Sequence, residues 1–597
     1  MRNTHVHARL QMAALLLVSL PLAAQDVSRK PARLAPNPTS TTIAAQQAGQ
    51  SATERIDLAM YQRIMDEGFN RSHIMDYASA LADDIGPRLT GSPNMAKANK
   101  WTREQFKAMG CSNAHLESWG EFGMGWQQLN TWVRMVSPDT AVFIAQATPW
   151  SPSTNGPVTG DVVWVNIQDQ KDFAQYRGKL AGKVVLFGPM RAVPPVDEPL
   201  FTRFSRQQLD ALTEYPAPGD QASDLSKRIQ AASRRRELID KVAQFFADEH
   251  VAGVIVPSRD APDGGGSGGT FFDDNGGALG TQPYNSDYRV KVPVVVMAIE
   301  HYGRMYRLLK AKVPVSVQMD VETKFTGDHE QGYNTIAEIP GTDPSLKDQL
   351  VMLGGHLDSW ISGTGATDNG AGAVVAMEVM RILTALHVHP RRTIRVALWS
   401  GEEEGLDGSR GYVRDHFGSY PVSTAPDQMK LPGWLRKPAG PLTIKPDQKL
   451  VSAYFNLDNG GGRIRGVYLQ ENASVAPIFA QWIAPLKTLG VTTLTLRNTA
   501  STDHIAFDAV GIPGFQFIQD PLDYKTRTHH SNMDVYEELQ PGDLQQAAVV
   551  EAIFVYDAAM RDEMLPRKPL PRPKAMVDTS GPLPLPGVFP DAVQSAQ

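Results

Sequence analysis

The stretch of sequence that decides the fold spans residues 349–401 and reads QLVMLGGHLDSWISGTGATDNGAGAVVAMEVMRILTALHVHPRRTIRVALWSG. Its first part, QLVMLGGH (349–356), is a short apolar run typical of a buried strand. The run GAGAVVAMEVMRILTAL (370–386) has the 3.6-residue period of a helix, and TIRVALWSG (393–401) predicts a second strand. A strand, a helix and a strand in this order predict α/β architecture.

The residues that follow extend the same pattern. LVSAYFNLD (450–458) and GIPGFQFI (511–518) predict further strands, and residues 544–560 predict a closing helix. We therefore expect an α/β fold with a mixed, mostly parallel sheet sandwiched by helices, formed by residues 326–565. Residues 56–140 read as the N-terminal part of this domain, with helical spacing from about Ile56 to Met109 and turn residues in GPRLTGSPN (86–94) between two helices.

Residues 141–325 have a different texture. Short β-branched runs such as DVVWVNI and KVPVVVMAI alternate with the helical pattern at 241–250, which predicts an inserted β-rich unit. The Gly-rich stretch DGGGSGGTFFDDNGG (263–277) predicts a loop, because glycine has many unfolded conformations and offers no side chain to pack.

The two ends of the chain do not read as parts of a fold. Residues 1–24 have basic residues, a short apolar run and two alanines, which predicts a signal peptide and a secreted or periplasmic protein. Residues 25–55 read as a low-complexity linker, and residues 566–597 as a Pro-rich tail. The single cysteine, Cys111, excludes an internal disulfide.

Composition narrows the classes of function. The chain has 597 residues, of which 42% are hydrophobic, and a formal net charge of -6. A chain of this length and balance can bury large cores and does not read as disordered. The absence of a long basic block argues against a nucleic-acid partner, and after the N-terminus no apolar run is long enough to span a membrane.

Five polar stretches carry the chemistry. A buried sheet normally excludes Asp, Glu and His unless these residues are paired or bind a metal. Most of the stretches adjoin a predicted strand or helix end, so they could converge in the crevice at the carboxyl ends of the strands. The stretches are GHLDSW (His356, Asp358), ATDNGAG (Asp368), SGEEEGLDGS (Glu402, Glu403), FNLDNGGG (Asp458) and THHSNMD (His529, His530, Asp534).

The donor types and their spacing indicate a metal-dependent hydrolase. Imidazole and carboxylate without thiolate suit zinc, cobalt and manganese also fit, and a bridging carboxylate permits two ions about 3.5 to 4 Å apart. Two-residue spacing would let the Asp358 carboxylate fix the tautomer of His356. Of the adjacent Glu402 and Glu403, one can bind metal while the other faces an attacking water. Each stretch taken alone more often belongs to a pair of charged residues on the surface, a solvent-exposed acidic face or a turn. Because the stretches occur together at the ends of strands, they favour a metal site.

The ordered set GHLDSW, TDNGAG, EEEGLDGS, NLD and HHSNMD resembles the co-catalytic zinc exopeptidases, a family that includes bacterial leucyl aminopeptidases, glutamate carboxypeptidase and carboxypeptidase Q. The resemblance is strongest to the carboxypeptidase Q-like members and extends from Asn70 to Pro566. It implies that residues 141–325 are a protease-associated domain insert. It also implies two Zn²⁺ per chain and short peptides as substrates, with homodimerisation as a further expectation.

The resemblance also implies roles for individual residues. His356 and Asp458 would bind one zinc, Glu403 and His530 the other, and Asp368 would bridge both. Asp358 would orient His356, and Glu402 would be the general base toward a metal-bridging hydroxide. His504 in STDHIAF is expected either to contact the substrate or to have an ordinary structural role. By the same comparison Glu404 would be a spectator, and His529 would support the site or be ordinary.

Several alternatives bear on function. Gly265 to Gly269 match the GxSxG pattern of serine hydrolases, but a glycine run satisfies that pattern by composition alone. A non-catalytic receptor homologue is the second alternative, and the presence of all five expected ligands and the base argues against it. Some of the motifs resemble those of aminopeptidases, which act at the N-terminus of a peptide, and others resemble those of carboxypeptidase Q. We expect an aminopeptidase or dipeptidase, with a carboxypeptidase of the glutamate carboxypeptidase type as the alternative.

Overall fold

The computed structural model describes residues 53–193, 195–215, 238–259, 268–272, 279, 290–425, 428, 436 and 439–570. The expected signal peptide (1–24), nearly all of the expected linker (25–55) and most of the Pro-rich tail (566–597) lie outside these residues. So does most of the Gly-rich stretch 263–277, including Ser267 of the GxSxG pattern.

The strand, helix and strand expected within residues 349–401 are all present. Strand β9 (Leu350–His356) and strand β10 (Thr393–Trp399) pair in parallel, and helix α9 (Ala371–Ala385) connects them. Strand β13 (Val451–Asn456) pairs in parallel with β9 on its other side, and β16 (Gly514–Gln519) pairs in parallel with β13. The carboxyl ends of these four strands therefore meet at one edge of the sheet.

The strands at the margins make the sheet mixed. Strand β14 (Ile464–Tyr468) is antiparallel to β16 and parallel to β15 (Thr493–Thr495), and β8 (Ser316–Ile339) is antiparallel to β10. In this part of the chain the strand order is β15-β14-β16-β13-β9-β10-β8. The expected mixed, mostly parallel α/β sheet is confirmed.

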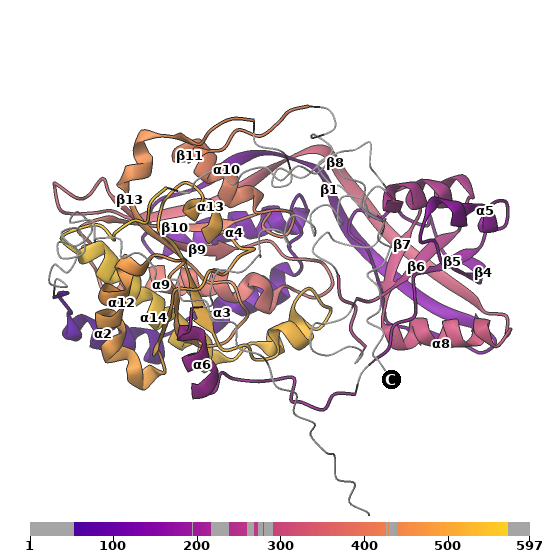
Figure 1. The fold of residues 1–597 in the computed structure, drawn as a ribbon, viewed down its shortest axis with the longest axis horizontal. Coiled ribbons are helices and arrows are strands. Elements are labelled where there is room, and N and C mark those ends of the chain that lie inside the picture. Colours follow the sequence, from indigo (N-terminus) through magenta and orange to yellow (C-terminus); the bar gives the residue numbers. More distant parts are fainter. Residues whose placement is uncertain are drawn as a thin grey trace, which may run out of the picture. The chain divides into compact units, whose positions relative to one another are not determined.

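Helices cover both faces of this sheet. The apolar side chains of one face pack with those of α9, and those of the other face pack around Tyr412 and Phe507. Figure 1 shows α10 and α13 on one side of β9 and β10, and α9 and α14 on the other. The flanking helices are α2 (Leu58–Asn70), α3 (Ile74–Ser79), α4 (Pro93–Ala108), α14 (Pro541–Met560), α10 (Asp407–His416) and α13 (His504–Asp508).

Strand β13 shows how the sequence alternates between these two cores. Phe455 stands on the α9 side, 6.0 Å from the ring of Phe554, whereas the neighbouring Tyr454 stacks on Phe507 at 4.3 Å on the opposite side. Successive side chains of a strand point to opposite faces, so a continuous apolar run is what a strand covered on both faces requires.

The β-rich segment forms a second set of strands. Strands β4 (Val158–Val165), β5 (Val184–Phe187), β6 (Gly253–Pro257) and β7 (Val294–Met297) pair in parallel in that order, and β3 (Ala145–Ala147) closes the edge antiparallel to β7. Residues 238–248 and helix α8 (Ile299–Lys310) are helical. This segment has a hydrophobic core of its own.

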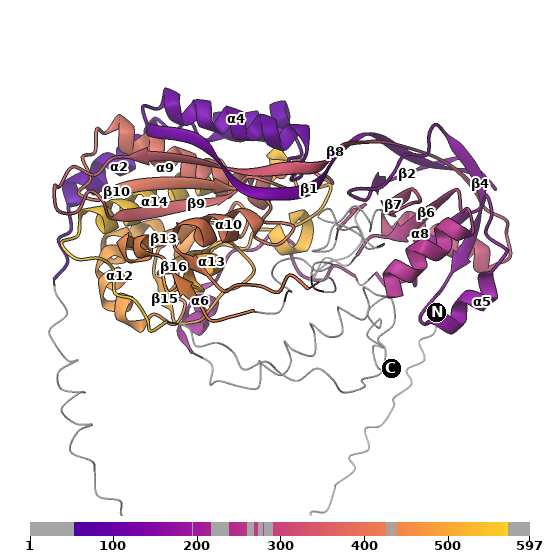
Figure 2. The ribbon, with the colours of Figure 1, turned by 90° about the horizontal axis from the view of Figure 1, so that it is seen from above.

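One long pair of strands is shared by both sets. Strand β1 (Ser112–Ser137) is antiparallel to β8 from Ser112 opposite Glu338 to Ser137 opposite Ser316, with several register shifts along the ladder. Strand β8 pairs with β10 near one end and with β4 near the other. Figure 2 shows β1 and β8 running side by side from the strands around β9 to those around β6.

The remaining elements are short. They are β2 (Ala141–Phe143), η1 (Ala80–Ile85), η2 (Gln170–Asp172), α5 (Phe173–Tyr176), α6 (Arg206–Thr213), η4 (Ala366–Gly370), β11 (Gly418–Ser419), β12 (Thr443–Ile444), η6 (Pro446–Leu450), η7 (Ala473–Val475), α12 (Ala476–Ile483), η8 (Ala484–Leu489), η9 (Tyr524–Thr528) and η10 (Tyr536–Glu538). Within the part of the chain that the structure describes, no helix combines the length and the apolar character needed to cross a membrane.

Candidate metal centre

Three of the sequence-predicted site residues follow directly from the strand ends. His356 is the last residue of β9, Glu402 comes three residues after the end of β10, and Asp458 comes two residues after the end of β13. In the register of the sheet His356 lies opposite Trp399. The strand ends therefore bring His356, Glu402 and Asp458 together, as the sequence predicts.

The first group of donors lies around His356. Its Nε2 is 3.4 Å from Asp368 Oδ1 and 3.5 Å from Asp458 Oδ1. These three residues each offer one donor atom, and the atoms lie within 4.8 Å of one another. Asp368 reaches this position from η4 (Ala366–Gly370), the irregular turn that leads into α9.

The second group lies on the other side of Asp368. His530 Nε2 is 3.0 Å from Glu403 Oε2 and 3.4 Å from Asp368 Oδ2. Asp368 thus directs Oδ1 toward His356 and Oδ2 toward His530. A carboxylate with one oxygen in each of two donor groups has the arrangement of a bridging ligand.

A further imidazole joins the second group. His529 Nε2 is 3.8 Å from Asp368 Oδ2, and its ring stacks on that of His530 with centroids 3.8 Å apart. With Asp368 and His530 it forms a set of donors within 4.8 Å of one another. The sequence left His529 either as a supporting or as an ordinary residue, and its adjacency to His530 was the signal that could have placed it here.

Asp358 lies beside His356, with its backbone carbonyl nearer to the imidazole than its carboxylate. The Nδ1 atom of His356 is 3.0 Å from the backbone carbonyl oxygen of Asp358 and 3.6 Å from its carboxylate Oδ1. The carboxylate Oδ2 instead accepts hydrogen bonds from Thr90 Oγ1 at 3.3 Å and from the Glu403 N–H at 3.2 Å. Strand β9 ends at His356, so the two-residue alternation of a strand no longer holds at Asp358.

The charges of the group depend on burial and on one another. Burial lowers the pKa of the His356 imidazole, but the carboxylates of Asp458 and Glu402 raise that pKa well above its usual value. Burial is the main reason that the pKa of Glu402 is raised well above the usual range of a carboxyl group. Glu402 Oε2 lies 3.9 Å from His356 Nε2, at the margin of the first group.

The donor set fits zinc. Glu403 Oε1 is buried and makes no hydrogen bond within the part of the chain that the structure describes, although buried carboxylates normally have a partner. Imidazole nitrogens and carboxylate oxygens are common zinc ligands, and clustered carboxylates repel one another unless a cation lies among them. His356, Asp368, Asp458, Glu403 and His530 are the residues that could hold the metal.

The β-rich segment contacts a loop of this site. The Phe272 N–H donates to the carbonyl of His530 at 3.0 Å, and Phe271 forms a β-bridge with Ser531. Trp360 meets the His530 ring edge-on at 6.1 Å between ring centroids and lines a pocket together with Glu403 and Asp368. The β-rich segment therefore touches the loop that carries the presumptive ligand His530.

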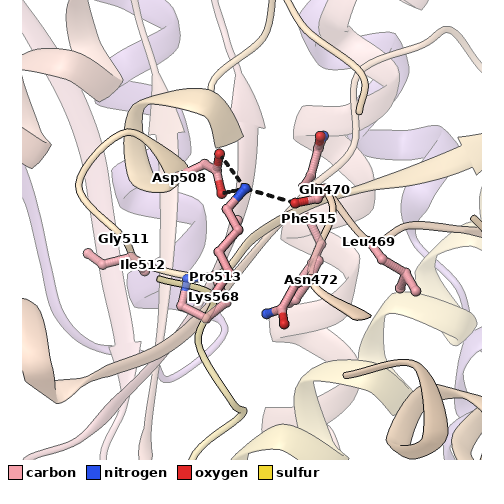
Figure 3. Close-up of a pocket in the computed structure, with 10 residues that line it drawn as sticks. Leu469, Gln470, Asn472, Asp508, Gly511, Ile512, Pro513, Phe515 and Lys568 are labelled. Carbon is pink, nitrogen blue, oxygen red and sulfur yellow. Dashed lines mark hydrogen bonds and ion pairs between the residues drawn. The ribbon is translucent and has the colours of Figure 1, made fainter. Parts of the chain in front are cut away.

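His504 lies apart from both donor groups. Its ring is fully buried, and Nε2 contacts the side-chain amide of Gln470 and, at 3.2 Å, the carbonyl of Thr499. Figure 3 shows the neighbouring pocket, where the Lys568 ammonium lies between the Asp508 carboxylate and the carbonyl of Gln470. A substrate-binding role for His504 stays a prediction.

The fold and the paired donor groups define a class of protein: the co-catalytic zinc exopeptidases, whose mostly parallel sheet carries its ligands at the strand ends. The part of the chain that carries these donor groups belongs to this family. Residues 334–555 match the family model described as Peptidase family M28.

The similar proteins agree with that assignment. Carboxypeptidase Q of Bos taurus is 25% identical over 524 residues, which cover 87% of this chain and 91% of the relative. Leupeptin-inactivating enzyme 1 of Streptomyces exfoliatus is 29% identical over 191 residues, 32% of this chain and 36% of the relative. The solved structure of a peptidase M28 precursor from Shewanella amazonensis SB2B has a TM-score of 0.58 and 20% identity, covering 86% of this chain and 98% of that one.

Proposed function

We propose that this protein is an exported exopeptidase that uses two zinc ions to hydrolyse the terminal peptide bond of short peptides, as an aminopeptidase or dipeptidase. The observation that carries the proposal is the position of Asp368, with one oxygen toward His356 and the other toward His530. His356 and Asp458 would hold one ion, Glu403 and His530 the other, and Asp368 both. His529 is close enough to support the second ion.

Zinc, when bound, supplies a Lewis acid for the peptide carbonyl and lowers the pKa of a water. Glu402 is the proton carrier in this proposal: its carboxylate takes a proton from the attacking water and passes it to the leaving amine. Burial favours this role because it raises the pKa of the Glu402 carboxyl group, which makes its carboxylate a stronger proton acceptor.

Asp358 would position the first imidazole. Its carbonyl lies 3.0 Å from His356 Nδ1 and can accept the N–H of the tautomer whose Nε2 faces Asp368 and Asp458. Its carboxylate is held by Thr90 and by the N–H of Glu403, so it also links the loop after β9 to the loop after β10.

The preference for short peptides rests on the enclosure of the site. The side chain of His356 is 1% exposed and that of Asp368 is 5% exposed. Trp360 and the segment around Phe272 stand beside the second donor group. A terminal residue can enter such a site more easily than the middle of a long folded chain. In this proposal the insert is a protease-associated domain, and residues 1–24 direct export.

A carboxypeptidase is the second candidate function. The relatives that match this chain over 87% of its length carry the name carboxypeptidase Q. An aminopeptidase must neutralise the substrate's α-ammonium group, whereas a carboxypeptidase must bind an α-carboxylate, usually through Arg, Lys or oriented N–H groups.

The two candidates are separated by turnover of three matched substrates by zinc-loaded protein: a dipeptide, the same dipeptide with a blocked N-terminus, and the corresponding amino-acid amide. We expect cleavage of the free dipeptide and the loss of cleavage when its amine is blocked. Cleavage of the blocked dipeptide would favour the carboxypeptidase. Failure to cleave any of the three, in protein that has bound zinc, would contradict the peptidase proposal.

A further inference from the structure

Arg88 is the third residue of the GPRLTGSPN loop, which runs from η1 to α4 and carries no presumptive ligand. Its side chain is fully buried. Burying a guanidinium group is costly unless its donors are satisfied. The hydrogen bonds of this side chain therefore show which segments of the chain it holds together.

The donors of Arg88 reach backbone carbonyls on three segments. Nε donates to Leu357 O at 2.6 Å, Nη1 to Thr364 O at 2.8 Å, and Nη2 to Gly365 O at 2.7 Å. Nη1 also contacts Gly86 O at 3.2 Å, within its own loop. A planar guanidinium with several donors in fixed directions can hold several carbonyls at once, which a lysine ammonium on a flexible stem cannot do.

These carbonyls belong to the loops that deliver the presumptive ligands. Leu357 lies between His356 and Asp358. Thr364 and Gly365 directly precede η4 (Ala366–Gly370), which carries Asp368, so one guanidinium links the residue after the end of β9 to the start of η4. The Asp534 carboxylate holds the same turn by accepting the N–H groups of Thr367 and Asp368.

The close approach of the two loops is visible at Gly365. Its φ of +63° lies in the left-handed region, and an added Cβ would lie 2.8 Å from Arg88 Nη2 and 2.3 Å from the Ser359 Cβ. Only glycine allows the carbonyl of residue 365 to reach the guanidinium at this distance. The backbone of Arg88 adds a reciprocal pair of hydrogen bonds with Ser359, through the Ser359 hydroxyl and N–H.

The positive charge of Arg88 is compensated by carboxylates at the candidate metal centre. The carboxylates of Asp534, Asp358, Asp368 and Glu403 all favour its charged form, while burial lowers the pKa of the guanidinium to about 10. The group therefore stays protonated at neutral pH. It is an internal cation next to a cluster of anions, held in place by carbonyls.

We propose that Arg88 is a positioning residue that fixes the spacing of the loops carrying His356 and Asp368, so that the two donor groups have their metal-binding geometry before a metal arrives. This inference rests on the proposed function, because it takes those residues as ligands.

The test compares zinc affinity in Arg88→Lys, Arg88→Met and a matched control, Arg392→Lys. Arg392 is also fully buried and also donates to backbone carbonyls, those of Arg561 and Asp562, but it lies just before the start of β10, at the opposite end of that strand from the centre. Arg88→Lys keeps the charge and most of the volume and is the variant expected to fold most readily.

We expect both Arg88 variants to bind zinc about 10- to 100-fold more weakly in chelator competition, the range found when partners of metal ligands are removed. In the cobalt-substituted protein their absorption spectra should change, because the coordination geometry changes. Arg392→Lys should keep the wild-type affinity and spectrum, even where its thermal stability falls as much.

Two results would overturn the proposal. One is wild-type zinc affinity and cobalt spectrum in both Arg88 variants. The other is wild-type behaviour in Arg88→Lys with a loss only in Arg88→Met, since charge alone would then explain the effect. Failure of the wild-type protein to bind zinc would instead refute the proposed function, and this inference with it.

Discussion

Acid should destabilise this protein through His504, which is buried as a neutral imidazole. Burial lowers the pKa of this side chain from 6.5 to about 4. As the pH falls below 6.5, the unfolded chain binds a proton at this position while the folded chain does not. Because the unfolded state then binds more protons, the free energy of unfolding decreases as the pH falls, and the loss levels off near the folded-state pKa.

The size of this effect follows from the two pKa values. They differ by about 2.5 pH units, and at about 1.4 kcal/mol per unit the loss amounts to about 3 kcal/mol between neutral pH and pH of about 4. Since domains typically unfold with about 5 to 15 kcal/mol, this loss is a substantial share of the total free energy of unfolding.

The assay is urea denaturation of the wild-type protein and of His504→Gln at a series of pH values. Glutamine cannot titrate, and its amide can still donate to the Thr499 carbonyl that His504 Nε2 faces at 3.2 Å. Other groups titrate equally in both proteins, so only the difference between them reports His504. We expect the stability of the wild-type protein relative to the variant to fall by about 3 kcal/mol from neutral pH to pH of about 4. A difference that stays constant over this range would refute the reasoning.

Three further predictions concern the centre and the core. Glu402→Gln should retain zinc and lose about 100-fold or more in turnover, because it removes only the proton carrier; metal analysis and kinetics check this, and full activity would reject the assignment. A chelator should lower the melting temperature, and added zinc should restore it, because the metal binds only the folded chain; an unchanged melting temperature would contradict a metal among these carboxylates. Phe554→Ala should cost about 3 to 5 kcal/mol in urea denaturation, because the ring is fully buried against Phe455 and Trp482, and a cost near zero would argue against that packing.

The sequence predicts the sheet well because apolar periodicity is a local property. The strands ending near His356 and Asn456 are visible as short apolar runs, and parallel pairing then brings their carboxyl ends together. The grouping of His356, Asp368 and Asp458 follows from that rule together with the polar residues at the strand ends.

Other features depend on contacts that no local pattern records. The choice of the Asp358 carbonyl as the nearest partner of His356 depends on how the chain turns after β9. Glu404 reads as part of a solvated acidic run, yet both of its carboxylate oxygens are buried. The guanidinium of Arg88 reaches carbonyls about 270 residues away along the chain, and backbone carbonyls have no signature in a sequence.

The domain boundaries show the same limit. Strand β8 (Ser316–Ile339) continues through the position at which the texture of the sequence changes, near residue 325, because one strand serves both sets of strands. Local amino-acid composition reflects the packing environment of the residues. One continuous strand can pass from one packing environment to another, so a change in composition does not mark the end of an element. The boundaries of the domains stay a prediction.

The pairing of β1 with β8 also sets an order of events during synthesis. Strand β1 leaves the ribosome early, but its partner is made only after the whole insert, since Ser112 pairs opposite Glu338 and Ser137 opposite Ser316. Contacts so distant in sequence form slowly, and at about 5 to 20 residues per second the nascent chain waits for at least several seconds with that side of β1 unpaired. A chaperone that binds extended segments would find its target in the unpaired β1. A chain whose synthesis stops before residue 316 lacks β8 and cannot complete the sheet.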